Sequence, residues 1–198
     1  AAGSLTYDRP WFRKRHFPCF MEFELDTFCN LDCRMCPPEL HSRKPGEVNE
    51  DIIIQTIQPL LSRLQWAKFY GGAPFLIKSY YRIWNEIIKS NARCRIIVQT
   101  NGPVLNGTIK ELLNAGNFRL SVSIDSLNPE NYERIRKGAH FENTWNNLLF
   151  FIEHSNQKKK PLNLSVCPMT DNLQDIPELI QFALKNRLYL YFNLLQYP

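Results

Sequence analysis

Three of the six cysteines lie within eight residues, and thiolates are good ligands for soft metal centres. They are Cys29, Cys33 and Cys36, with three residues in the first gap and two in the second. A structural zinc site uses four protein ligands, usually in two separated pairs; the sequence has no second pair, although His41 offers a fourth ligand. A [4Fe–4S] cluster normally takes four thiolates, so three would leave one iron open for a ligand and for chemistry.

Further polar residues follow apolar, strand-like runs at 20–25, 67–70, 95–99, 118–124, 162–166 and 188–195. The cysteine triplet follows the first run, and each later run also ends in residues able to bind a ligand. In order these are Gly71-Gly72-Ala73-Pro74, Thr100-Asn101-Gly102, Ser123 with Asp125 and Ser126, Cys167 to Asp171, and Asn193 with Gln196. Because the carboxyl ends of parallel strands share one edge of a sheet, we expect them to form one ligand-binding edge.

Amphipathic helical patterns separate the strand-like runs. Helices are expected at 52–64, 80–88, 145–152 and 176–184. Pro59 should bend or shorten the first of them. Asn128, followed by proline, and Asp175 with Glu178 have the pattern of helix starts, and Gly116 that of a helix end.

Strands that alternate with helices predict βαβ units and a parallel sheet. An eight-unit α/β barrel usually needs about 250 residues, so six units need about 190. The sequence has 198 residues. We therefore expect an α/β fold, a partial (βα)6 TIM-like barrel with parallel strands. Since the sequence ends just after the sixth run, we expect the last helix to be missing from it.

The spacing Cys29-x3-Cys33-x2-Cys36 after the first strand resembles the signature of the radical S-adenosylmethionine (radical SAM) enzymes. This resemblance implies a [4Fe–4S] cluster held by the three cysteines, with the amino and carboxylate groups of SAM on the open iron. It also implies that an electron from the reduced cluster cleaves SAM to methionine and a 5′-deoxyadenosyl radical.

The resemblance covers nearly the whole chain. Met35 matches a family position that lies near the adenine of SAM, with simple packing in the loop as the alternative. Gly71, Gly72 and Ala73 are similar to the start of the family's Gly-Gly-Glu-Pro motif, which receives the SAM amino group. Ala73 departs from that motif, because it lacks the carboxylate that would attract the SAM ammonium. Glycines let the backbone approach a ligand closely, although a Gly-Gly-x-Pro segment is also a common turn.

The third and fourth strands resemble those of a subgroup that contains peptide-modifying, sulfatase-maturing and molybdenum-cofactor enzymes. The matching residues are 99–102 and 121–126, and the helix at 132–136 is similar as well. The resemblance implies that Ser123 faces the ribose or carboxylate of SAM and that Asn101 and Asp125 lie on the same rim. It further implies that Arg136 reaches the SAM carboxylate. Ordinary roles stay open: a turn at Asn101, a helix cap at Asp125 and a solvated Arg136.

By the same resemblance, residues 19–198 are expected to form the radical SAM core domain, after an N-terminal extension at 1–18. The chain is expected to be truncated before a C-terminal extension. The predicted function is radical SAM catalysis on a peptide, protein or small molecule, with flavodoxin or ferredoxin as the electron donor. The alternative, favoured by Ala73, is a degenerate, non-catalytic module that binds an iron–sulfur cluster or zinc.

The net charge of +5 comes largely from basic runs at 13–16 and 158–160. We interpret both runs as solvated loops, which makes a nucleic acid the less favoured partner. The sequence shows neither an apolar stretch of membrane-spanning length nor a signal-peptide pattern, so we expect a cytoplasmic protein without membrane contact. Cys19 and Cys94 are expected to be core thiols. Cys167 is expected to pack in the core, with a substrate-facing role as the alternative.

Overall fold

The computed structural model describes residues 18–41 and 44–194. The predicted N-terminal extension, apart from Pro18, lies outside the described residues, as do the basic run at 13–16 and Gln196. In the described ranges, no helix is both long and apolar enough to cross a membrane.

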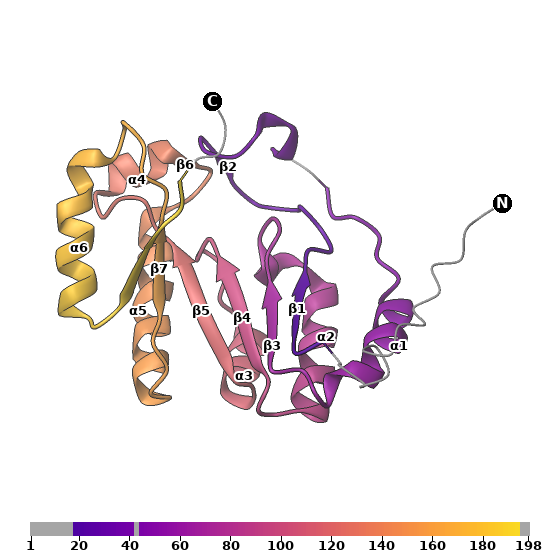
Figure 1. The fold of residues 1–198 in the computed structure, drawn as a ribbon. Helices are drawn as coiled ribbons and strands as arrows, with labels where there is room; N and C mark the ends of the chain where they lie inside the picture. Colours follow the sequence, from indigo (N-terminus) through magenta and orange to yellow (C-terminus); the bar gives the residue numbers. More distant parts are fainter. Residues whose placement is uncertain (1–17, 42–43, 195–198) are drawn as a thin grey trace, which may run out of the picture.

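Six parallel strands form one sheet, as the alternating pattern predicts (Figure 1). The strands are β1 (Phe20–Phe23), β3 (Trp66–Phe69), β4 (Arg95–Thr100), β5 (Phe118–Ser123), β7 (Asn163–Val166) and β8 (Tyr189–Phe192). Their order in the sheet is their order in the chain, and every neighbouring pair is parallel. The prediction of an α/β partial barrel is confirmed, although single strands begin or end a few residues from their predicted positions.

Helices connect successive strands, and α2, α3 and α5 lie behind the sheet in Figure 1. The helices are α1 (Glu50–Leu61), α2 (Lys78–Ser90), α3 (Gly107–Ala115), α4 (Pro129–Ile135), α5 (Phe141–Gln157) and α6 (Ile176–Lys185). Helix α1 ends soon after Pro59, which therefore shortens the predicted helix. The apolar stripe of α2 packs on the sheet, where Tyr80 and Trp84 both contact the ring of Phe69 edge-on.

Two of the predicted helix caps are confirmed and one is wrong. The Asn128 side chain accepts from the backbone N–H of Asn131 at the start of α4, and Gly116 follows the last residue of α3. Asp175 precedes α6 but its side chain makes no capping hydrogen bond with Glu178 or another residue of the helix. Its carboxylate instead accepts from the side-chain amide of Asn131, because a short 3-10 turn leads into α6 and turns Asp175 toward α4.

The two cysteines predicted to be core thiols differ in their surroundings. Cys94 is buried, as predicted. Cys19 is exposed, so that prediction is wrong. It precedes β1, which is an edge strand, and its carbonyl accepts from the backbone N–H groups of Gln65 and Trp66 while its side chain faces outward.

Candidate active site

The segment that carries the three cysteines passes over the carboxyl ends of the strands (Figure 1). It includes a two-residue strand, β2 (Asp32–Cys33), which pairs antiparallel with β6 (Arg136–Lys137). Cys33 lies directly opposite Arg136 in this pairing. A turn closed by a 3.1 Å hydrogen bond from Cys36 N–H to Cys33 C=O then positions the last cysteine. The cysteine segment is therefore fixed to a part of the chain that follows β5.

The Gly-Gly turn after β3 packs against the segment between β1 and the cysteines. The N–H of Gly72 donates to Asp26 C=O at 3.2 Å, and that of Ala73 donates to Phe28 C=O at 2.7 Å. A Cβ atom on Gly71 would lie 2.3 Å from the Asp26 oxygen, and one on Gly72 would lie 2.0 Å from the Phe28 oxygen. Both glycines are therefore required by the close approach of two backbone segments, in addition to any approach to a ligand.

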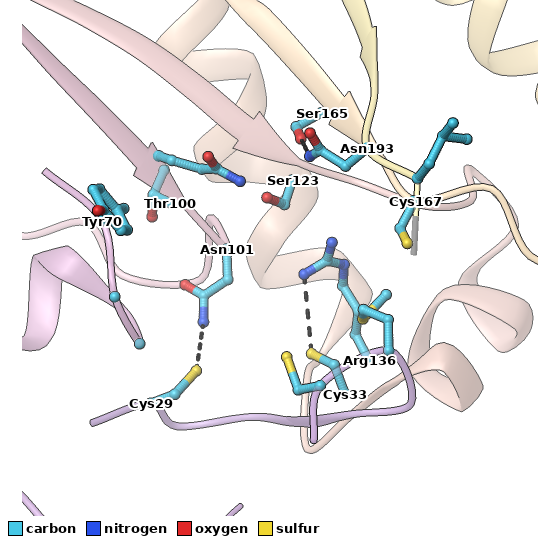
Figure 2. A pocket seen from close by; sticks show the side chains of 16 residues that line it. Cys29, Cys33, Tyr70, Thr100, Asn101, Ser123, Arg136, Ser165, Cys167 and Asn193 are labelled. Carbon is cyan, nitrogen blue, oxygen red and sulfur yellow. Dashed lines mark hydrogen bonds between the residues drawn. The ribbon is translucent and has the colours of Figure 1, made fainter. Parts of the chain in front are cut away.

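One cavity of about 400 Å³ opens at this edge of the sheet (Figure 2). Nine predicted site residues line it: Cys29, Cys33, Cys36, Met35, Gly71, Gly72, Asn101, Ser123 and Arg136. The lining also includes Tyr70, Gln99, Thr100, Ser165, Cys167, Asn193 and Leu194. Two predicted residues, Ala73 and Asp125, are buried outside the lining.

The strand register explains why Ser165, which the sequence did not single out, lines the cavity together with Cys167 and Asn193, which the sequence placed at the ligand-binding edge. Ser165 of β7 lies opposite Ser123 of β5, so both side chains reach the same face. Cys167 is two residues further along the chain and keeps to that face. The side-chain amide of Asn193 donates to the Ser165 hydroxyl (Figure 2). For Ser165 the available signal was alternation along a strand, but this signal identifies the residue only once the neighbouring strand and its register are known.

Side-chain N–H groups approach two of the three cysteine sulfurs, as Figure 2 shows. The Asn101 amide donates to Cys29 Sγ at 3.5 Å and to Asn30 Oδ1 at 3.0 Å. The Arg136 guanidinium donates to Cys33 Sγ at 4.0 Å. Both donors come from elements other than the cysteine segment, so the walls of the cavity contact the thiols directly.

Arg136 is neither solvated nor inside a helix. It follows α4, its side chain is only 8% exposed, and its Nη2 lies 2.7 Å from Asp125 Oδ2. Asp125 is fully buried and accepts from the backbone N–H of Cys167 at 2.7 Å, so the carboxylate binds inside the barrel rather than capping a helix. Burial alone would lower the pKa of Arg136, but the charge and hydrogen bond of Asp125, together with the nearby Cys33 and Tyr132, outweigh burial and raise the pKa. The guanidinium therefore stays charged and already has a carboxylate partner.

The three thiols differ in how readily they ionise. A hydrogen bond between the Cys33 and Cys36 thiols raises the pKa of Cys33 and lowers the pKa of Cys36 to about 6. Burial raises the pKa of Cys29. The charge of Arg136 favours the thiolate at all three positions. The thiolate is the form that binds metals, and Cys36 is the thiol of the three that loses its proton most easily.

The cavity fits a group larger than a single ion. In the part of the chain that the structure describes, no three His, Cys, Asp or Glu side chains are arranged to hold one metal ion. His41 contacts the Cys33 carbonyl through Nε2 at 3.2 Å and is not in the lining. Three soft sulfur donors border a cavity in the size range of cofactor sites. Asn101 Oδ1 is buried there without a hydrogen-bond partner among the described residues, so it can accept from a ligand.

Comparison with known proteins assigns the family. The model of the protein family described as "Radical SAM superfamily" matches residues 24–183 of this chain. The chain therefore belongs to the radical SAM superfamily, whose cofactors are a [4Fe–4S] cluster and SAM. The resemblance seen in the cysteine spacing, and the cofactors that it implies, are confirmed.

Curated relatives include enzymes named GTP 3′,8-cyclase. The chain is 32% identical over 165 residues to the probable GTP 3′,8-cyclase of Methanocaldococcus jannaschii, and 30% identical over 129 residues to the GTP 3′,8-cyclase of Peptoclostridium acidaminophilum. These matches cover 82% and 62% of this chain, and 54% and 39% of the relatives. The chain spans about half the length of the curated relatives that it matches.

Solved structures share the fold at low sequence identity. SuiB of Streptococcus suis bound to S-adenosylmethionine superposes with a TM-score of 0.72 and 15% identity, covering 92% of this chain and 42% of that one. The structure of anSMEcpe with bound AdoMet and Kp18Cys peptide superposes with a TM-score of 0.70 and 18% sequence identity. This match covers 90% of this chain and 52% of that one. These similarities establish a shared α/β partial-barrel architecture.

Proposed function

We propose that this chain carries the radical-generating site of an enzyme that modifies a small molecule, peptide or protein. The observation that carries the proposal is the convergence of Cys29, Cys33 and Cys36 on one cavity, in a chain of the radical SAM superfamily. When bound and reduced, the cluster supplies the electron that cleaves SAM to methionine and a 5′-deoxyadenosyl radical. The protein supplies the thiolates, orients SAM and encloses the radical.

Residues around the cavity have separate roles in this proposal. The three cysteines would hold the cluster as thiolates. The unpartnered oxygen of Asn101 offers an acceptor for a SAM hydroxyl or ammonium, and Ser123 offers a hydroxyl on the neighbouring strand end. Met35 gives the lining an apolar side chain for the adenine.

Ala73 is buried outside the lining, so this chain supplies no side chain at position 73 for the SAM ammonium. We propose that the backbone at Gly71 and Gly72, which does line the cavity, receives the SAM amino group. Arg136 would reach the SAM carboxylate only by sharing its guanidinium with Asp125, which it already contacts.

A nucleotide is the first substrate class to test. The curated relatives named GTP 3′,8-cyclase reach 32% identity over 82% of this chain. A peptide is the second class, supported by the similar fold of anSMEcpe, whose structure contains the Kp18Cys peptide. Incubating the reduced protein with SAM and either GTP or a peptide library would separate them by which compound is consumed.

We also propose flavodoxin or ferredoxin as the electron donor and a cytoplasmic location. The core domain is proposed to span residues 19–198, which contains the 24–183 match, with residues 1–18 as an extension. Reduction of the reconstituted protein by flavodoxin, followed optically, tests the donor.

The function is tested by SAM cleavage. The chain is reconstituted anaerobically with iron and sulfide, reduced with dithionite and given SAM, and 5′-deoxyadenosine and methionine are quantified. We expect both products from the wild type and from Cys19→Ala, whose exposed thiol lies outside the cavity, and neither from Cys33→Ala. An iron–sulfur cluster without 5′-deoxyadenosine would establish the degenerate alternative, and bound zinc without iron would contradict the cluster assignment.

A further inference from the structure

Two cysteine sulfurs each receive a side-chain N–H group from a distant part of the chain (Figure 2). Asn101, at the end of β4, donates to Cys29, and Arg136, in β6, donates to Cys33. The partners of the first pair are 72 residues apart and those of the second are 103 residues apart. Neither contact therefore follows from the local geometry of the cysteine segment.

Both donors are held in place by further contacts. The Asn101 amide also donates to Asn30 Oδ1 at 3.0 Å, and Asn101 is 8% exposed. The Arg136 guanidinium bridges Cys33 Sγ and the fully buried carboxylate of Asp125, which lies 2.7 Å from Nη2. The pairing of β2 with β6 also sets the backbone of Arg136 opposite Cys33. The donors are thus oriented by the protein itself.

Donors in these positions have a predictable effect on a metal centre bound by the cysteines. Adding one electron to a [4Fe–4S] cluster increases the negative charge on its thiolate ligands. Hydrogen bonds to the sulfurs, net charge and burial are the features that set such reduction potentials. An N–H dipole or a guanidinium beside a sulfur stabilises the reduced state more than the oxidised state. The carboxylate of Asp125, which contacts the other terminal nitrogen of the guanidinium, weakens this effect at Cys33.

We propose that Asn101 and Arg136 are positioning residues that raise the reduction potential of the cluster by donating to Cys29 and Cys33. This inference rests on the proposed function, since it requires a cluster at the three cysteines. The alternative is that both side chains merely order the cysteine segment. That role would change how much cluster is bound without changing its potential.

The test is a redox titration of the reconstituted full chain without SAM, followed by electron paramagnetic resonance (EPR). The variants are Asn101→Ala, Arg136→Gln and Arg136→Lys, with iron and sulfide content measured for each. Asn30→Ala is the matched control, because it removes the other hydrogen bond of Asn101 and leaves the bond to Cys29.

We expect Asn101→Ala and Arg136→Gln to shift the midpoint potential to more negative values. The shift is expected to be larger for Arg136→Gln, which removes a full charge, and smaller for Arg136→Lys, which retains one. Asn30→Ala should titrate as the wild type does.

Cluster-containing Asn101→Ala and Arg136→Gln proteins that titrate at the wild-type potential would overturn the inference. Arg136→Gln can fail to fold, because it leaves the buried Asp125 carboxylate unpaired. In that case the midpoint potentials of Asn101→Ala and Arg136→Lys decide between a shifted potential, which supports the inference, and the wild-type potential, which overturns it. A wild type that yields no [4Fe–4S] signal at all would instead contradict the proposed function.

Discussion

The hydroxyl of Tyr80 joins the ends of two strands just before the cysteine segment and the Gly-Gly turn begin. It accepts from Leu25 N–H at 2.9 Å and lies 2.8 Å from Tyr70 C=O and 3.0 Å from Phe23 C=O. Burial raises the pKa of Tyr80 to about 12, so the hydroxyl keeps the proton that it donates. One proton can serve one carbonyl at a time, so Tyr80→Phe removes two hydrogen bonds. At about 1 kcal/mol each, the loss is about 2 kcal/mol.

The assay is thermal and urea unfolding of the protein without cofactors. For a chain of this length, about 2 kcal/mol corresponds to a Tm lowered by about 4–8 °C. Tyr81→Phe is the matched control on the same helix: its hydroxyl donates to Phe75 C=O at 2.6 Å and also contacts the Asn106 side chain, from a half-buried position where water can replace both partners. We expect a loss of about 1 kcal/mol or less for that variant. Equal losses for the two variants, or a Tyr80→Phe protein as stable as the wild type, would refute this reasoning.

Two further predictions follow from close packing and burial. Gly72→Ala should destabilise the fold by about 3 kcal/mol in urea unfolding, because its Cβ would lie 2.0 Å from the Phe28 carbonyl oxygen. Gly107→Ala, with no atom within 4 Å of its Cβ, should stay within about 1 kcal/mol of the wild type, and equal effects would contradict the packing argument. Iodoacetamide should alkylate exposed Cys19 in the native protein well before buried Cys94, whose pKa burial raises to about 11. Comparable rates by mass spectrometry would argue against this difference.

The sheet and most of the cavity lining could be predicted because their signals are local. Strand-like runs and helical stripes are short-range patterns, and in a parallel sheet they dictate which residues share the carboxyl edge. The spacing of the cysteines likewise lies within one segment. Nine of the predicted site residues accordingly line the cavity.

The surroundings of Arg136 and Ala73 could not be predicted in the same way. A two-residue strand such as β2 has no periodicity, so nothing in the sequence indicates that Cys33 pairs with Arg136. An arginine after a helix is ordinarily solvated, and its burial here depends on the buried carboxylate of Asp125, which pairs with the guanidinium. Ala73 is buried outside the cavity lining, directly after glycines that pack against the backbone of Asp26 and Phe28.

The EPR spectrum of the reconstituted, reduced chain with and without SAM tests the central claim most directly. Three cysteine ligands leave one iron free, so we predict a [4Fe–4S] signal whose shape changes when SAM is added. A cluster signal that SAM leaves unaltered would contradict an open iron at this cavity.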